Sequence, residues 1–410
     1  MSEPEPSPGD LAAAMRSELV ENILPFWMEY APDRDRGGFH GEIGDDLRIN
    51  DGAQRGSVLC SRILWTFASA YRRIGKTEYL DAADWAFRAL TETFIDPEYG
   101  GVFWSVDSEG NPVEDRKHHY AQAFAIYGLT EYHRVRPGAG ALELAQSIYE
   151  LLEEHARDRR YGGYIEGSAR DWSELERMRL SERDLESRKS MNTMLHVIEA
   201  YSNLLRVHED QALARRHHAL ITLFLDRILR NGHLSLFFDD EWNPLTPAWS
   251  FGHDIEAAWL LVDGAILHDD EDLIYRCGDA AIALAERTMT EGTDDDGGII
   301  YEAEPGRVTD GNKAWWVQAE AIVGYHTAWL ISRDGRFLDA MNRSWRYISE
   351  HLIDRERGGW IKQLTRDNRR IPGRPRVSLW DCPYHHGRAC MEMVERIQAG
   401  GGARLVDRLS

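Results

Sequence analysis

Apolar residues recur at the three- and four-residue spacing of amphipathic helices along most of this 410-residue chain. These segments come in pairs: one pair is "SRILWTFASAYRRIG" and "TEYLDAADWAFRALTETFI", and a later one is "MNTMLHVIEAYSNLLRVH" and "ALARRHHALITLFLDRIL". Each pair follows a short Gly-Gly motif with a strand-like run behind it, such as "YGGVFWSVDSEGNP". The motif predicts a strand-turn or a small β-hairpin.

The Gly-Gly motif divides the chain into six repeats. The copies begin at Arg36, Tyr99, Tyr161, Asn231 (a degenerate copy), Asp296 and Arg357. Two helices in each repeat predict about twelve helices. Six helical hairpins closed into a ring form an (α/α)6 barrel, an all-α fold with short β-hairpins at one end. An open α-solenoid or two separate bundles would use the same elements, and the absence of long linkers favours the closed ring.

The sequence predicts a single catalytic domain between two short tails. We expect a disordered tail over residues 1–12, the barrel over 13–398 and a flexible tail over 399–410. The opening "MSEPEPSPGD" is rich in proline and acidic residues and has no apolar stretch, so it does not read as a signal peptide. No apolar run approaches the roughly 18 residues of a membrane-spanning helix, and we expect a cytoplasmic protein.

Charge and cysteine content narrow the classes of partner. With 48 Lys and Arg against 69 Asp and Glu, the net charge of −21 repels phosphate backbones, so we expect neither nucleic acid nor a membrane as partner. The four cysteines form no CxxC pair, which disfavours a disulfide framework and a structural zinc site. The 14 Trp, 16 Tyr and 12 Phe include flat side chains that can stack on a small carbohydrate. We expect a monomer or a weak homodimer.

Each helix that follows a hairpin carries a polar or aromatic residue near its start, on an otherwise apolar face. In chain order these residues are Arg62, Tyr120, His196, His253, Trp316 and His385. If rotation about the barrel axis relates the repeats, all six meet near one end of the barrel. In "SFGHDIEAAWLL", Glu256 follows His253 by three positions and shares its helix face.

Three histidines and a carboxylate raise the question of a metal. The histidines at positions 196, 253 and 385, together with Glu256, are chemically adequate ligands. No HxH or HExxH spacing is present, however, and the histidines come from the third, fourth and sixth repeats. We therefore expect no metal and no other cofactor.

The same residues suit acid–base chemistry. His253 and His385 stand two repeats apart around the ring, so they approach a central ligand from different sides. One imidazole can then remove a proton from one face of a planar intermediate and the other can return it to the opposite face, because histidine titrates near neutrality. Glu256 would orient His253, and Arg62 would stabilise an oxyanion. This assembly fits proton abstraction next to a carbonyl better than hydrolysis.

Several long segments are similar to those of the N-acylglucosamine 2-epimerase superfamily, and within it to those of the cellobiose 2-epimerases. They include "SRILWTFASAY", "YAQAFAIYGLTEY", "KSMNTMLHVIEAYSNLLRV", "SFGHDIEAAWLL", "AWWVQAEAIVGY" and "CPYHHGRACMEM", in family order between Met15 and Arg396. The resemblance implies the (α/α)6 barrel that the repeats already predict. It also implies inversion of C2 in a reducing-end glucose or mannose unit, without a nucleotide or metal cofactor.

The resemblance implies catalytic roles for five residues. His253 and His385 would exchange the C2 proton through a cis-enediolate, after the sugar ring has opened to its aldehyde. Arg62 and His196 would hold the carbonyl and enediolate oxygens. Glu256 would support His253.

A second group implied by the resemblance binds the substrate. Asn192 and Tyr120 would position the sugar. Trp316 and Trp380 would stack on it, and Glu320 is counted among the substrate-binding residues.

The segment "DWSELERMRLSERDLESRKS" after the third hairpin resembles the loop that disaccharide-acting members place over the cleft. It favours a β-1,4-linked disaccharide such as cellobiose, lactose or mannobiose. An aldose–ketose isomerase and an N-acylglucosamine 2-epimerase use the same enediolate and stay open as alternatives. A glycoside hydrolase needs two carboxylates flanking the bond, and Glu256 has no evident partner among the helix starts. A non-catalytic carbohydrate-binding protein would keep the tryptophans without needing paired histidines.

Overall fold

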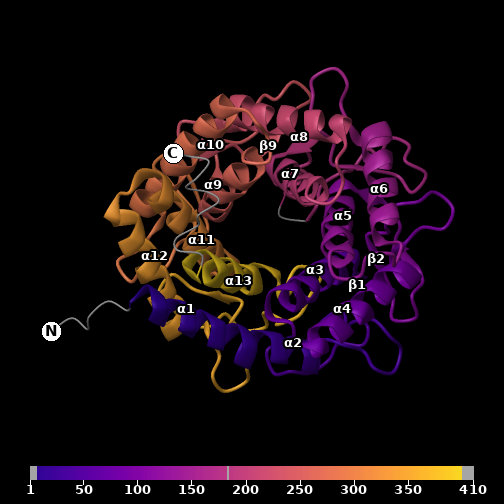
Figure 1. The fold of residues 1–410 in the computed structure, drawn as a ribbon, viewed down its shortest axis with the longest axis horizontal. Coiled ribbons are helices and arrows are strands. Elements are labelled where there is room, and N and C mark those ends of the chain that lie inside the picture. The colour runs from indigo at the N-terminus through magenta and orange to yellow at the C-terminus, as the bar shows by residue number, and fades with distance from the viewer. Residues whose placement is uncertain (1–6, 182–183, 399–410) are drawn as a thin grey trace.

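The computed structural model describes residues 7–181 and 184–398, and its helices form two concentric rings (Figure 1). The inner helices are α3 (Ser57–Ile74), α5 (His119–His133), α7 (Met191–Leu205), α9 (Phe251–Ala265), α11 (Trp315–Ser332) and α13 (Tyr384–Gln398). The outer helices are α1 (Pro8–Ser17) with α2 (Leu24–Tyr30), α4 (Thr77–Ala89), α6 (Ala141–Leu151), α8 (Gln211–Leu223), α10 (Glu271–Arg287) and α12 (Gly335–Tyr347).

Each outer helix contains a π-helical segment. In the first, this segment joins α1 to α2 into one continuous helix; in the other five it forms the last turn. The segments are Glu18–Ile23, Leu90–Phe94, Leu152–Ala156, Phe224–Ile228, Thr288–Gly292 and Ile348–Leu352. Counted as continuous helices, the described part of the chain contains twelve, which is the predicted number. None of these helices has the length and apolar character needed to cross a membrane.

Contacts between helices close the ring. Each inner helix packs against the next one along the chain, and the last, α13, packs against the first, α3. The N-terminal helix α1 packs against α13, so it completes the outer ring beside the last inner helix (Figure 1). The (α/α)6 barrel is thereby confirmed, and the open solenoid and the pair of separate bundles are excluded.

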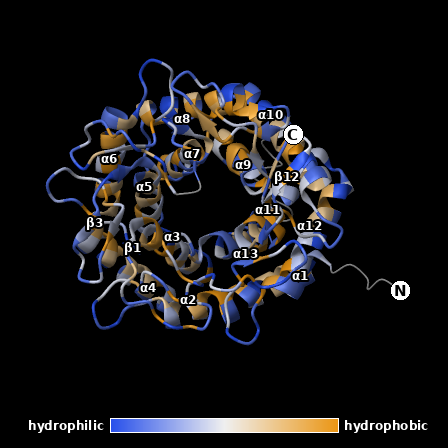
Figure 2. Cartoon of the chain, turned by 180° about the vertical axis from the view of Figure 1, so that it is seen from behind, coloured by the Kyte–Doolittle hydropathy of each residue, from blue (hydrophilic) through white to orange (hydrophobic). Residues whose placement is uncertain are grey.

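Burial distinguishes the two rings. In α5 every residue from His119 to Tyr132 is buried, because neighbouring helices cover it on all sides. In α12 the buried residues instead recur at the three- and four-residue spacing of one helix face, from Phe337 to Trp345. Figure 2 shows the same division: hydrophilic residues dominate the outer loops, and hydrophobic residues gather where the rings meet.

Short antiparallel strands join neighbouring repeats at the N-terminal end of the inner helices. Strand β1 (Arg55–Gly56) leads into α3 and pairs with β2 (Ser105–Val106), which forms the hairpin of the second repeat with β3 (Pro112–Glu114). The other sheets are β4 (Lys117–His118) with β5 (Gly167–Ser168), β6 (Lys189–Ser190) with β9 (Phe237–Phe238), β7 (Leu229–Arg230) with β8 (His233–Leu234), β10 (Trp249–Ser250) with β11 (Glu302–Glu304) and β12 (Arg307–Asp310), and β13 (Lys313–Ala314) with β14 (Gln363–Leu364). The predicted hairpins therefore also act as links between repeats.

The glycine pair makes each tight turn possible. Gly100 and Gly101 have φ values of 70° and 69°, a region that residues with a Cβ atom rarely adopt. A Cβ atom on Gly101 would also lie 2.7 Å from Oε1 of Gln122, whose amide bonds to the backbone of Val102. The turn therefore fits closely against the start of α5.

An ion pair fastens five of the six turns to the inner ring. In the second repeat Lys117, two residues before α5, donates to Asp96 at 2.8 Å, and Asp96 also accepts backbone N–H groups of the turn. The corresponding pairs are Arg55–Asp33, Lys189–Asp158, Lys313–Asp296 and Arg376–Asp354. The fourth repeat differs, because Trp249 stands two residues before α9 and its turn "LRNGHL" contains no aspartate.

The predicted N-terminal tail over 1–12 is too long. Helix α1 starts at Pro8, and Leu11 is buried. The helix forms here because α1 packs against α13 and a proline suits the first helical position. The remaining positions of the two predicted tails, 1–6 and 399–410, lie outside the described residues.

The insertion after the third turn contains no helix among its described residues. Met178 and Leu180 are buried, and the carbonyl oxygen of Met178 lies 3.1 Å from Nε2 of His118, just before α5. The insertion therefore packs against the end of the barrel that carries the strands.

Candidate active site

The six predicted helix-start residues meet at the strand-bearing end of the inner ring. The Tyr120 ring lies 5.0 Å from the His196 ring, measured between centroids. His253 lies 4.9 Å from Trp316, and Trp316 lies 5.4 Å from His385. The repeats thus bring together side chains that stand far apart in the sequence.

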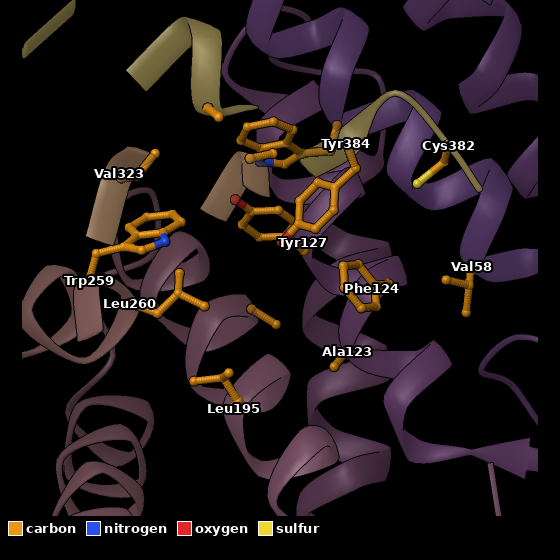
Figure 3. Close-up of a cluster of buried hydrophobic side chains, with 14 of the residues drawn as sticks. Val58, Ala123, Phe124, Tyr127, Leu195, Trp259, Leu260, Val323, Cys382 and Tyr384 are labelled. Carbon is orange, nitrogen blue, oxygen red and sulfur yellow. The ribbon is translucent and has the colours of Figure 1, made fainter. Parts of the chain in front are cut away.

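Arg62 is a buried cation surrounded by aromatic side chains. Its Nη2 donates to the hydroxyl of Tyr120 at 2.6 Å, and its Nη1 donates to the backbone oxygen of Trp380 at 3.4 Å. Its guanidinium lies 4.1 Å from the ring of Phe124 and 5.0 Å from that of Tyr384, which belong to the buried cluster in Figure 3. The Nε atom of Arg62 is buried without a hydrogen-bond partner among the described residues, so the guanidinium still has N–H groups that no protein acceptor uses.

Two of the histidines are anchored by carboxylates. The Nδ1 atom of His196 lies 2.8 Å from Oε2 of Glu199, one helical turn further along α7. The Nδ1 atom of His385 lies 2.7 Å from Oε1 of Glu320 in α11. Such a bond sets the ring orientation and the tautomer, and it leaves Nε2 as the nitrogen that can face a ligand.

His253 has no such anchor. Its Nδ1 finds no hydrogen-bond partner within the described part of the chain, and its ring packs against Trp316. The prediction that Glu256 orients His253 is therefore wrong. Oε1 of Glu256 accepts from Arg388 at 2.8 Å and lies 3.8 Å from Nδ1 of His385, because a guanidinium is a stronger partner for a carboxyl group than a neutral imidazole is.

Arg388 links carboxyl groups from three inner helices. Its Nη1 donates to Glu199 and to the hydroxyl of Tyr384. Its Nη2 donates to Glu256 at 2.8 Å and to Glu320 at 2.7 Å. All five side chains are buried. This cluster lies one layer below the helix-start residues and supports two of the three histidines.

The sequence prediction does not include this layer, although a spacing signal exists. Glu199, Glu256 and Arg388 each follow a helix-start histidine by three positions. A residue three positions later lies about one turn deeper on the same helix face. Charged residues that recur at this offset in three repeats therefore indicate a second polar layer beneath the first.

Glu320 supports the histidine rather than the substrate. Its Oε1 accepts from His385 and Arg388, and its Oε2 accepts from Nε1 of Trp259 at 2.9 Å. Both oxygens are thus occupied by buried donors. The predicted substrate-binding role of Glu320 is corrected to a positioning role.

The carboxyl groups of the cluster differ in ionisation. Burial raises the pKa of Glu199, but the charge of Arg388 and the bond with His196 outweigh it and hold this pKa at about 2. Burial and the neighbouring Glu320 raise the pKa of Glu256 well above its usual range, and burial also raises that of Glu320. At neutral pH Glu199 is therefore ionised, whereas burial and the neighbouring Glu320 favour the protonated form of Glu256.

The three histidines are neutral at pH 7 in the free protein. Burial lowers the pKa of His196 and of His253. Burial, reinforced by the charges of Arg62 and Arg388, lowers the pKa of His385 well below its usual value. A neutral imidazole can accept a proton, which is what a general base requires.

The predicted sugar-binding residues lie on the more exposed side of the site. Asn192, Trp316 and Trp380 are half-buried, as is His253, whereas Tyr120 is buried. The Oδ1 atom of Asn192 has no partner among the described residues and can accept from a hydroxyl. A ligand that enters along the two tryptophans therefore reaches the histidines.

One group of possible metal ligands occurs among the described residues. It consists of Glu256, Glu320 and His385, whose ligand atoms all lie within 4.8 Å of one another. This is not the set of three histidines considered from the sequence. Nη2 of Arg388 donates to both carboxyl groups, so a cation already stands between them. These three side chains therefore belong to the internal ion-paired cluster around Arg388.

Comparison with known proteins defines the class: this is a carbohydrate epimerase, an enzyme of the isomerase class. The family model N-acylglucosamine 2-epimerase (GlcNAc 2-epimerase) matches residues 37–386, which hold every candidate site residue named above except Arg388. The chain belongs to the N-acylglucosamine 2-epimerase family.

Similarity to individual relatives extends over nearly the whole chain. The chain is 41% identical over 388 residues to a cellobiose 2-epimerase of Bacteroides fragilis, covering 94% of this chain and 98% of the relative. It is 38% identical to a cellobiose 2-epimerase of Dictyoglomus turgidum, covering 93% and 99%. The solved cellobiose 2-epimerase of Bacillus thermoamylovorans B4167 matches with a TM-score of 0.90 at 38% identity, covering 95% of this chain and 100% of that one.

Proposed function

We propose that the protein inverts C2 of the reducing-end glucose or mannose unit of a β-1,4-linked disaccharide such as cellobiose, lactose or mannobiose. The observation that carries this proposal is the position of His253 and His385, whose rings lie 4.9 Å and 5.4 Å from the ring of Trp316. A sugar stacked on this half-buried tryptophan lies within reach of two imidazoles from different helices.

The chemistry follows from these groups. After the sugar opens to its aldehyde, one neutral imidazole takes the C2 proton, and the electrons of the C–H bond form the C1–C2 double bond of a cis-enediolate. The guanidinium of Arg62 and the ring of His196 stabilise the charge on the oxygens. The second imidazole, protonated at this step, returns a proton to the opposite face of C2. The carboxyl group of Glu256, whose protonated form burial favours, lies next to His385 and is a source for it.

Turnover of cellobiose in D2O tests the proposal. The epimerised product should carry deuterium at C2, and His253→Asn and His385→Asn should each abolish both the product and the label. His351→Asn is the matched control, because His351 lies on the outer ring and should leave turnover unchanged. Fructose from mannose without an epimerised disaccharide would show an aldose–ketose isomerase, and released glucose would show a hydrolase. Full labelling by both histidine variants would contradict the assignment of the acid–base pair.

The proposal also includes the cellular location and the oligomeric state of the enzyme. Composition supports a cytoplasmic location, and the acidic net charge of −21 supports a monomer or a weak homodimer, because like-charged copies repel each other. Sedimentation at several protein concentrations and cell fractionation test these two points.

A further inference from the structure

A side chain at the fourth position of an inner helix ties the helix to its turn. In the second repeat Gln122 accepts from the backbone nitrogen of Val102 at 2.8 Å and donates to its oxygen at 2.8 Å. In the fifth repeat Gln318 makes the same two bonds with Ile299. Asp254 holds this position in the fourth repeat, where its Oδ1 accepts a backbone N–H of the turn at 2.9 Å. In the fourth repeat, which carries the unanchored His253, an ionisable side chain therefore makes this link between the inner helix and its turn.

The second oxygen of Asp254 is bonded to an imidazole. Nδ1 of His233 lies 2.7 Å from Oδ2 of Asp254, and its Nε2 lies 3.2 Å from Oε2 of Glu291. The ring stacks on Trp249 at 4.2 Å. The ring thus joins two carboxyl groups, one on α9 and one on the π-helical segment that follows α10. Arg287, which donates to Glu291, is the other charged group at this place.

Asp254, which makes these bonds, follows His253 directly in the first turn of α9. The imidazole of His253 has no carboxylate partner among the described residues, so the backbone of the first turn of α9 sets its position. That turn is confined on one side, because a Cβ atom on Gly252 would collide with the ring of Trp316. On the other side it is held by the bonds of Asp254 to β8 and to His233.

We propose that His233 is a positioning residue, which acts through Asp254 to hold His253 in place. The inference rests on the proposed function of His253. Without the imidazole of His233, Asp254 keeps its bond to the backbone of Leu234 but loses its second one, and Glu291 remains with Arg287. The first turn of α9 then gains freedom, and turnover falls.

Steady-state kinetics with cellobiose tests this role. His233→Ala removes the donor to Asp254, so kcat should fall by about fivefold to tenfold with KM within about twofold, as for a loss of transition-state placement. His233→Gln keeps a donor for Asp254 and should recover most of the lost kcat. A His233→Ala enzyme with the wild-type kcat, or a His233→Gln enzyme with no recovery, would overturn the inference.

An independent readout separates this inference from the proposed function. In protein labelled with 13C at histidine Cε1, the resonance of His253 is identified by its loss in His253→Asn. It should change position in His233→Ala and return to its wild-type position in His233→Gln. A change of this kind in a protein that epimerises no disaccharide would sustain the inference and contradict the proposed function. A His253 resonance that is the same in the wild type and in His233→Ala would refute the inference whatever the activity.

Discussion

The Nη2 atom of Arg388 lies 2.8 Å from Oε1 of Glu256 in the buried centre of the inner ring. The other oxygen of this carboxyl group, Oε2, has no partner among the described residues, and burial raises the pKa of the group well above its usual range. Glu199 contacts the same guanidinium as an ionised carboxylate and also bonds to His196. The arginine therefore balances carboxyl groups of unequal charge, and their replacement should have unequal effects.

Replacing each glutamate by glutamine tests this difference. Glu256→Gln substitutes an amide for a neutral carboxyl group and should change the free energy of unfolding by about 1 kcal/mol or less. Glu199→Gln removes the charge that faces Arg388 and should lower it by about 3 kcal/mol. Urea unfolding at pH 7 measures both variants. Equal losses in the two variants would show that Glu256 is ionised as well.

The sequence predicts the ring and its helix starts because their signals are local. Apolar spacing marks the helices, and the glycine pairs mark turns that need positive φ, as at Gly100 and Gly101. The cluster around Arg388 has only the three-residue offset from the helix-start histidines as a signal. This offset does not pair its members, since they come from helices more than fifty positions apart that only the closed ring brings together. The same reason explains the incorrect partner of Glu256: spacing places it near His253, but the packing of α9 against its neighbours selects Arg388.

A single methyl group at the start of α9 should disrupt the site. A Cβ atom on Gly252 would collide with the ring of Trp316 and lie 2.6 Å from the side chain of Val317. Gly252→Ala should therefore displace the tryptophan on which the sugar stacks, and kcat/KM should fall by at least about tenfold. Gly335→Ala is the matched control, because a Cβ atom there meets nothing within 4 Å. Kinetics with cellobiose and near-UV circular dichroism of both variants check this, and a Gly252→Ala enzyme with wild-type kinetics would contradict the packing argument.

Buried neutral histidines should make the fold sensitive to acid. Burial lowers the pKa of His119 to about 4, and burial lowers those of His326 and His386 to about 3. The unfolded chain then binds more protons than the folded one below about pH 6.5, so stability falls as the pH decreases from there towards these folded-state values. Each such histidine accounts for a loss of about 1.4 kcal/mol between pH 7.5 and 5.5.

His326→Leu isolates one of these contributions. Nδ1 of His326 has no partner among the described residues, so leucine removes a titrating ring without breaking a bond at that atom. The drop in the free energy of unfolding between pH 7.5 and 5.5 should shrink by about 1.4 kcal/mol. A drop of the same size in His326→Leu would show that this ring is protonated in the folded protein.

The ion pairs that fasten the turns should contribute to stability according to their burial. Lys117 is fully buried and donates to Asp96 at 2.8 Å, so Lys117→Met leaves a buried carboxylate with less compensation and should cost about 3 kcal/mol. Lys76→Met is the control, because Lys76 is 52% exposed in its pair with Glu78 and its loss should leave the stability almost unchanged. The double variant Lys117→Met/Asp96→Asn should recover part of the loss, since it removes the carboxylate that Lys117 no longer compensates and that keeps only Arg170 as a charged partner. Urea unfolding of the three variants gives the coupling energy, and a Lys117→Met protein as stable as Lys76→Met would mean that the glycine turns hold the barrel end without their ion pairs.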